Sequence, residues 1–277
     1  PCMILKSDGA ALYDTTDLAT LIEREKLYHP DEVIYLADKR QELHFVQVFR
    51  CAKKTKIINE NMELKFIGFG TMNGKDGKPF KTRDGGVMRL ESLINDINEE
   101  MYKKIAENRT MSEEEARKTA QMVALSAMKY GDLSNQAAKD YVFDVERFIS
   151  FEGNTGPYNL YTIVRIKSIL AKYAESGKDA AKCKMKKPQT QSEKALMLEL
   201  SKYNDVMENA FAETAPHKIC QYIFDLSNAF NSFYHDTRIL AEEDKARQAG
   251  WIALITLVKR VLEACIQVLG FEAPSRM

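Results

Sequence analysis

Apolar and polar positions follow different patterns in the two parts of the chain. In the first part, apolar runs of strand length occupy Glu32–Asp38 and Glu63–Gly70, and the first run leads at once into a segment with helical spacing. From about Leu90 onward apolar residues recur every three to four positions. This spacing predicts helices over residues 112–129, 158–174, 193–212, 217–240 and 244–269. The pattern therefore predicts an α/β part followed by an all-α part.

Several residues suit the ends of these predicted helices. Ser112 precedes three glutamates in a first turn, where a hydroxyl cap and negative charges satisfy free N–H groups and the helix dipole. Pro157 suits a first helical position, and Gly270 suits a helix stop. These features predict helix boundaries and imply no catalytic role.

Composition adds a few constraints. The chain has 277 residues, 45% of them apolar, which is enough to fill the cores of two domains. Its formal charge is zero, so a nucleic acid would have to be held by local basic patches. Its five cysteines are odd in number and widely separated, which argues against a disulfide framework or a metal site and for a reducing, cytoplasmic location. No apolar run approaches the length that spans a membrane, and we expect no membrane partner.

A basic, glycine-rich loop follows the second predicted strand. Residues 74–86 read GKDGKPFKTRDGG, in which Lys78, Lys81 and Arg83 supply charge suited to phosphate and the glycines permit close backbone approach. The spacing of a Walker loop is absent. Taken alone, the loop fits a ligand-free surface turn equally well.

Tyr13 and Asp17 lie four residues apart at the start of a predicted helix, so their side chains share one face. One interpretation makes Asp17 an ordinary first-turn carboxylate, with Asp14 or Thr15 as the cap. The other is a cation site, because an aromatic face beside a carboxylate suits a guanidinium.

Gln41 and His44 follow the predicted strand Glu32–Asp38 directly. They are therefore expected at the carboxyl end of a strand, where open α/β sheets bind ligands. A lone histidine in a helix is more often structural, so position is the only argument for a role of His44.

Six collinear segments resemble the carboxyl-terminal half of an arginyl-tRNA synthetase. They are LKSDGAALYDTTDLAT, YLADKRQELHFVQVF, GKPFKTRDGGVMRLESLI, MKYGDLS, DYVFDVERFISFEGNTGPY, and FNSFYHDTRIL with the terminal LGFEAPSRM. Together they span essentially the whole chain. The resemblance implies the later half of a class I Rossmann catalytic domain over residues 1–110, followed by an α-helical anticodon-binding bundle over residues 111–277.

The resemblance also implies roles for particular residues. Tyr13, Asp17 and Gln41 match positions that bind the arginine substrate, and His44 matches a residue near ATP. The segment Lys78–Arg83 stands where class I synthetases carry their KMSKS loop, so Lys78, Lys81 and Arg83 are the expected catalytic cations and Lys81 also contacts ATP. The implied partners are L-arginine, Mg²⁺-bound ATP and tRNA(Arg), with no DNA and no protein-bound metal.

The helical part supplies candidates for contact with the anticodon. Phe230, Phe233 and Tyr234 form an aromatic stripe, for which we expect core positions for the phenylalanines and RNA contact for Tyr234. Met277 ends a tail that resembles the family's terminus near the anticodon, although a disordered end is the simpler interpretation. The lysine-rich stretch 174–192 is expected to be an exposed linker, whose charges are more often solvated than bound to RNA.

The resemblance is incomplete at the amino-terminal side. The four histidines lie outside any His-x-Gly-His signature, and Pro1 is not an initiator methionine, so we expect a fragment of a longer enzyme. Two functions remain open: an arginine-tRNA ligase, inactive as this fragment, and a non-catalytic tRNA-binding module. A nucleotide-binding α/β protein with an unrelated helical domain would leave the shared order of Tyr13, Asp17, Gln41 and the basic loop unexplained.

Overall fold

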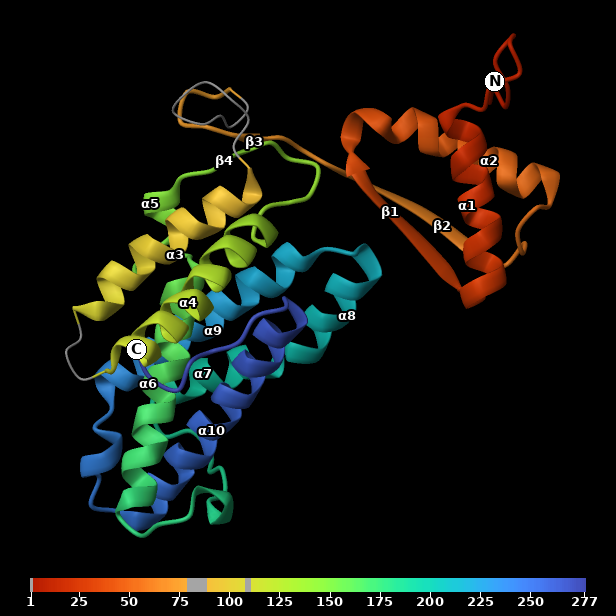
Figure 1. Cartoon of the computed structure of the whole chain (residues 1–277). Coiled ribbons are helices and arrows are strands. Elements are labelled where there is room, and N and C mark those ends of the chain that lie inside the picture. The colour runs from red at the N-terminus through yellow and green to blue at the C-terminus, as the bar shows by residue number, and fades with distance from the viewer. Residues whose placement is uncertain (1, 79–88, 108–110) are drawn as a thin grey trace. The chain divides into compact units, whose positions relative to one another are not determined.

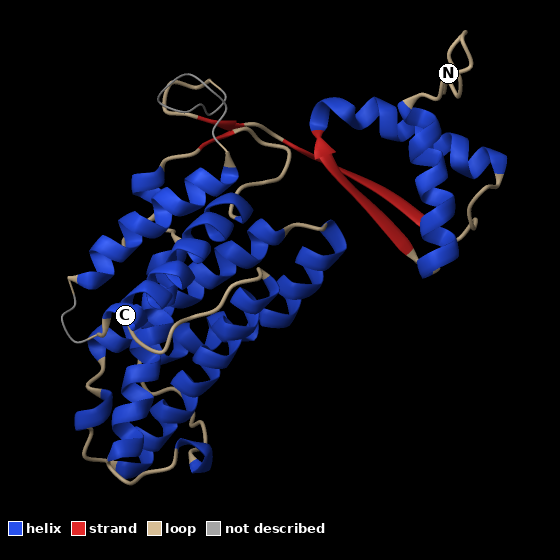
Figure 2. Ribbon diagram, in the orientation of Figure 1, coloured by secondary structure: helices blue, strands red, loops and turns tan. Residues whose placement is uncertain are grey.

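The computed structural model describes residues 2–78, 89–107 and 111–277, and it divides into two compact units. The first unit comprises Pro1–Pro79 together with Ala137–Val142. The second comprises Phe80–Gln136 and Phe143–Met277. The α/β part and the helical part expected from the apolar pattern are both confirmed (Figures 1 and 2).

The first unit is built around two parallel strands. Its elements are α1 (Tyr13–Tyr28), β1 (Glu32–Asp38), the 3-10 turn η1 (Lys39–Gln41), α2 (Glu42–Thr55), β2 (Glu63–Phe69), β3 (Met72–Asn73) and β4 (Tyr141–Val142). β1 and β2 pair in register from Glu32 with Glu63 to Asp38 with Phe69, and α2 provides the crossover that a parallel pair requires. Both predicted strands are therefore present.

One face of this strand pair forms the core of the unit. α1 and α2 pack against it with Leu18, Leu21, Tyr35, Phe45, Val48, Ala52, Ile58 and Met62. The opposite face carries Ile34, Leu36 and Phe69, whose side chains are exposed. Parallel strands are normally apolar on both faces because both are covered, and β1 follows that rule in sequence.

Residues 137–142 leave the helical segment and dock beside the end of β2. Gly70 N–H donates to the carbonyl of Ala137, and Met72 and Asn73 pair in parallel with Tyr141 and Val142. A Cβ atom on Gly70 would lie 2.5 Å from the Lys139 backbone, so only glycine fits this crossing. The strands β3 and β4 have two residues each, too short for an apolar pattern to predict.

The second unit is helical. Its elements are α3 (Leu90–Ala106), α4 (Glu113–Leu133), α5 (Val145–Phe148), α6 (Gly156–Glu175), η2 (Ala180–Lys182), α7 (Gln191–Ser201), α8 (Tyr203–Glu213), α9 (Pro216–Asp236), η3 (Ile239–Ala241) and α10 (Lys245–Val268). Helix α4 pairs with α3 and α6, while α9 packs on α6, α7, α8 and α10. The Ser112 hydroxyl accepts from Glu115 N–H, Pro157 lies in the first turn of α6, and Gly270 has φ +80°, as predicted.

The sequence prediction is wrong about one helix. The segment 193–212, which is predicted as a single helix, forms two helices, α7 and α8, which meet at Lys202. The ψ angle of Lys202 is −8°, far from the helical value near −42°, so the chain changes direction there. Lys202 is neither glycine nor proline, and no sequence breaker announces the change.

Helix α3 was not among the predicted helices, although its buried residues Leu93, Ile97, Met101 and Ile105 recur at a spacing of four. By its contacts α3 belongs with the helices that follow it. The division of the family domains at residues 110 and 111 stays a prediction.

Candidate functional site

The carboxyl end of β1 carries a turn that leads directly into the candidate site. Asp38 caps η1, because its carboxylate accepts from Arg40 N–H at 2.9 Å and from the Arg40 guanidinium at 2.8 and 2.7 Å. These bonds with Arg40 hold the pKa of Asp38 at about 2. The turn makes Gln41 the residue that precedes α2 and places His44 in the first turn of that helix.

Asp17 and His44 meet across α1 and α2. The His44 Nε2 atom lies 2.6 Å from Asp17 Oδ2, and its Nδ1 atom lies 2.8 Å from Asp14 Oδ1. Phe45 contacts the imidazole edge-on, with ring centroids 5.1 Å apart. The histidine is thus held between two carboxylates from one turn of α1.

Asp14 does not cap α1. The residue before the helix is Leu12, and the Thr15 hydroxyl accepts from Leu12 N–H at 3.4 Å and donates to the carbonyl of Ile4. Asp14 instead accepts from Met3 N–H at 3.0 Å through its second oxygen. A site role for Asp14 is not among the sequence predictions, although its place three residues before Asp17 puts both carboxylates on one helix face.

Tyr13 and Gln41 flank this cluster in sequence. Tyr13 is the first residue of α1, and its side chain is 84% exposed. Gln41 is exposed at the start of α2. The assignment of Tyr13, Asp17 and Gln41 to one arginine pocket stays a prediction.

The basic loop begins with a tight turn. Gly74 N–H donates to the Lys78 carbonyl at 2.8 Å, and Gly77 takes a φ of +73°, which a residue with a side chain adopts only with strain. Lys78 is exposed. Lys81 and Arg83, the other two cations predicted for the triphosphate, lie outside the described residues.

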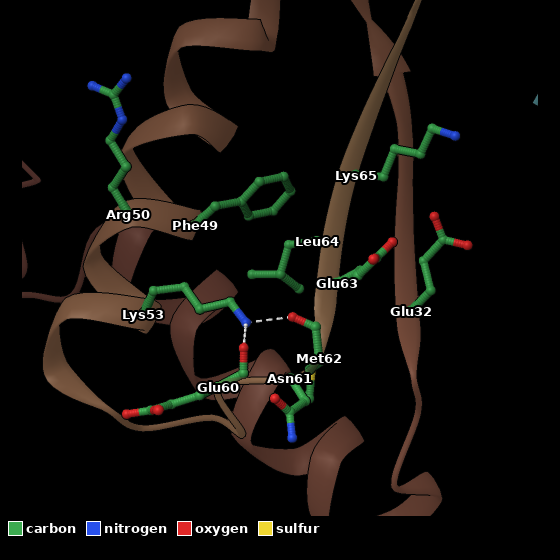
Figure 3. Close-up of a pocket in the computed structure, with 10 residues that line it drawn as sticks. All are labelled: Glu32, Phe49, Arg50, Lys53, Glu60, Asn61, Met62, Glu63, Leu64 and Lys65. Carbon is green, nitrogen blue, oxygen red and sulfur yellow. Dashed lines mark hydrogen bonds between the residues drawn. The ribbon is translucent and has the colours of Figure 1, made fainter. Parts of the chain in front are cut away.

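An open groove of about 790 Å³ lies at the other end of the strands (Figure 3). Glu32 and Glu63, the first residues of β1 and β2, line it together with Lys53. Because ligands of open α/β sheets bind at the carboxyl ends of the strands, this groove is at the wrong end for substrate. The Lys53 ammonium is already committed to the carbonyls of Asn59, Glu60 and Met62.

A second candidate surface lies between α6 and α9. Phe230 and Phe233 are fully buried, which confirms their predicted core positions, whereas Tyr234 is 39% exposed. The Arg165 guanidinium lies over the rings of Tyr234 and Tyr161, at 5.3 and 4.7 Å. We call Tyr161, Arg165 and Tyr234 the α6/α9 platform. Only Tyr234 is among the residues predicted from the sequence.

The carboxyl-terminal tail is tied to the helical unit. Lys129 donates to the carbonyl of Gly270 at 2.5 Å, and Lys167 donates to the carbonyls of Ala273 and Pro274 at 3.0 and 3.2 Å. Phe271 is buried. These hydrogen bonds hold residues 270–276 against the helices, so the interpretation of the tail as a disordered end is wrong for these residues.

Among the described residues, no group of histidine, cysteine, aspartate and glutamate is arranged to hold a metal ion. Within the same residues, no helix has the length and apolar character needed to cross a membrane.

Residues 1–145, more than half of the chain, match the catalytic domain of class I (R) tRNA synthetases. The chain belongs to the arginyl-tRNA synthetase family. Residues 159–277 match the DALR anticodon-binding domain, which agrees with the helical unit of the fold.

Individual relatives agree with this family. The chain is 61% identical to an arginine-tRNA ligase of Agathobacter rectalis and 57% identical to one of Alkaliphilus oremlandii. Each match covers 100% of this chain and 48% or 47% of the relative, so the chain spans about half the length of these curated relatives.

Solved structures support the same fold. The Plasmodium falciparum arginyl-tRNA synthetase matches with a TM-score of 0.82 at 25% identity, over 100% of this chain and 47% of that one. The Thermus thermophilus arginyl-tRNA synthetase matches with a TM-score of 0.79 at 22% identity, over 99% of this chain and 50% of that one, and shows likeness of fold.

Proposed function

We propose that the chain is the part of an arginine-tRNA ligase that holds the arginine side chain, the triphosphate loop and the anticodon. The observation that carries the proposal is the oriented carboxylate of Asp17 beside the carboxyl end of β1, in a member of this family. A partly buried carboxylate there suits a guanidinium through charge-assisted hydrogen bonds. Tyr13 on the same helix would supply an aromatic face for stacking, and Gln41 would orient the substrate.

This arrangement favours arginine over neutral analogues and over lysine. A neutral side chain would leave the Asp17 carboxylate without a countercharge, which sites of this kind reject strongly. Lysine carries a point charge in place of a planar fork, so it would lose both the bidentate pairing and the stacking on Tyr13.

The proposed reaction is a two-step acyl transfer. The arginine carboxylate attacks the α-phosphate of ATP to give arginyl-adenylate and pyrophosphate, and the 3′-terminal ribose of tRNA(Arg) then takes the acyl group and releases AMP. Lys78, Lys81 and Arg83 would stabilise charge that develops on the phosphates, each contact contributing about 3 kcal/mol when preorganised. Lys81 is the proposed direct ATP contact, and His44, whose ring nitrogens face Asp14 and Asp17, would lie near the ATP site. Mg²⁺ would enter with ATP as part of the substrate.

The proposed RNA contacts lie on the helical unit. Tyr161 and Tyr234 are each about two-fifths exposed and share one guanidinium, so the α6/α9 platform offers flat surfaces for unstacked bases. Met277 is the second proposed contact, and the hydrogen bonds that anchor the preceding residues of the tail support this proposal. An overall charge of zero makes such local features the basis of tRNA binding.

A non-catalytic tRNA-binding module is the second candidate. It is favoured by the exposed apolar face of the two-stranded sheet, because Ile34 and Leu36 indicate a catalytic domain that is structurally incomplete by itself. In that case Tyr234 and Met277 would act, and the arginine and ATP contacts would remain unused.

One pair of assays tests both candidates. Arginylation of tRNA(Arg) by this polypeptide would be measured with ATP and Mg²⁺, alongside equilibrium binding of tRNA(Arg) and of an anticodon-substituted tRNA. We expect binding that weakens with the substituted anticodon. Charging would establish a ligase that acts as this fragment. Anticodon-sensitive binding without charging would identify a truncated ligase that keeps its recognition domain, and failure of the same polypeptide to bind arginine would then favour the module. Neither charging nor binding would leave only the family membership.

A further inference from the structure

His44 joins two carboxylates that would otherwise repel each other. Asp14 and Asp17 lie three residues apart on α1, hence on one face of the helix, and each is within 2.8 Å of a different nitrogen of the same imidazole. The three side chains are 15–29% exposed, so water screens them only in part. Their arrangement therefore decides which carboxylate oxygens the site presents to a ligand.

The two contacts restrain the ring. Each imidazole nitrogen faces a carboxylate oxygen of α1, so the ring cannot rotate without losing a contact. His44 on α2 therefore holds both carboxylates of α1 in place.

The same contacts fix the direction of each carboxylate. Asp14 uses one oxygen for His44 and the other for Met3 N–H. Asp17 gives Oδ2 to His44, and because an ionised carboxylate accepts about four hydrogen bonds, it keeps capacity for a second donor. Asp14 is thus a structural partner of His44, whereas Asp17 can bind a further cation in a fixed orientation.

We infer that His44 is a specificity-determining positioning residue: it orients Asp17 and occupies Asp14, so that the site selects a planar guanidinium over an ammonium. This inference rests on the proposed arginine site. Without His44, Asp14 would keep only Met3 N–H as a partner and Asp17 would rotate freely, so the two carboxylates would attract any cation. Binding of a cation would persist, but discrimination between arginine and lysine would fall.

The test compares two variants of the whole chain with a matched control. H44F keeps an aromatic ring beside Phe45 and removes both ring nitrogens, whereas H44Q keeps an amide group that can hydrogen-bond to one carboxylate. The control is H235Q, because His235 has a 91% exposed side chain on α9. L-arginine and L-lysine are titrated into each protein by calorimetry, and circular dichroism checks the fold.

We expect the ratio of arginine to lysine affinity to fall about tenfold or more in H44F, to fall less in H44Q, and to stay unchanged in H235Q. An unchanged ratio in H44F, or loss of ATP affinity in place of arginine selectivity, would overturn the inference and leave the proposed function standing. If the unsubstituted chain binds no arginine, the arginine site and the inference fail together.

Discussion

Arg276 and Glu115 form a two-pronged ion pair that joins the end of the chain to the first turn of α4. Arg276 Nε donates to Glu115 Oε1 at 2.5 Å, and Nη2 donates to Oε2. The pair adds to the contacts that Lys129 and Lys167 make with the tail. Met277, the proposed RNA contact, is therefore attached to a held segment.

The first prediction concerns this anchor. R276Q removes the ion pair and frees the last residues, so tRNA(Arg) affinity should fall about threefold to tenfold, which filter binding at fixed salt can measure. Both partners are partly exposed, so the melting temperature should change little. The control R260Q removes an exposed arginine of α10. Equal losses in the two variants would point to loss of positive charge alone and contradict the anchor.

The α6/α9 platform gives a second prediction. Y234A removes a half-exposed ring on which a base could stack, so tRNA(Arg) affinity should fall by about 1–3 kcal/mol. F211A is the matched control, because Phe211 is an 86% exposed aromatic residue on α8. Equilibrium binding would decide the matter, and a loss for F211A as large as for Y234A would indicate nonspecific contact.

Tyr130 leads to a prediction about stability. Its ring is fully buried in α4, and its hydroxyl lies 2.6 Å from the carbonyl of Cys220 and 2.5 Å from Asn154 Oδ1. Burial raises its pKa far above the usual range, so the phenol stays protonated and available as a donor. Y130F should lower the free energy of unfolding by about 1–3 kcal/mol, since the buried carbonyl of Cys220 would lose its donor.

Chemical denaturation followed by circular dichroism measures this loss. Y203F is the control, because Tyr203 lies at the less buried start of α8. Equal stability of Y130F and the unsubstituted chain would mean that the hydroxyl contributes nothing.

Asp38 and Arg40 give a prediction about acid. Because hydrogen bonds from Arg40 hold the folded-state pKa of Asp38 at about 2, below its usual value of 3.8, this carboxylate stabilises the fold above pH 3.8. The contribution is lost as the pH falls toward 2. In R40A the pKa of Asp38 should rise toward 3.8, as a carboxyl carbon NMR titration would show. R50A, which changes an exposed arginine of α2, should leave that titration unchanged.

The sequence predicted the features that depend on local spacing. The strands β1 and β2, the core positions of Phe230 and Phe233, and the caps at Ser112 and Gly270 follow from side-chain periodicity and turn chemistry, and all are present. Helix α3 carried an equally clear signal in the spacing of Leu93 and Ile97. The spacing therefore predicts α3 as well, although this helix is missing from the helices predicted above.

Other features depend on how elements meet. The contact between Asp14 and His44 requires the packing of α1 on α2, and the shared guanidinium of Tyr161 and Tyr234 requires α6 beside α9. Tertiary packing determines such pairs, and the spacing of residues along one helix does not predict them. The bend at Lys202 likewise has no local breaker.

The packing of residues 137–142 against the first unit restricts where the gene can be divided without disrupting a folded unit. Asp140 accepts from Lys39 Nζ and from Thr71 N–H, each at 2.8 Å, so a segment that follows α4 completes a unit that otherwise lies before α3. If the gene is divided once between residues 79 and 137, residues 137–142 are separated from the strands that they pack against. If it is divided after residue 142, residues 80–136 are separated from the rest of the helical unit. Recombination that exchanges the helical unit between relatives also exchanges residues 137–142. The new segment must then fit Lys39 and Thr71 of the recipient, so the two units are expected to change together in evolution.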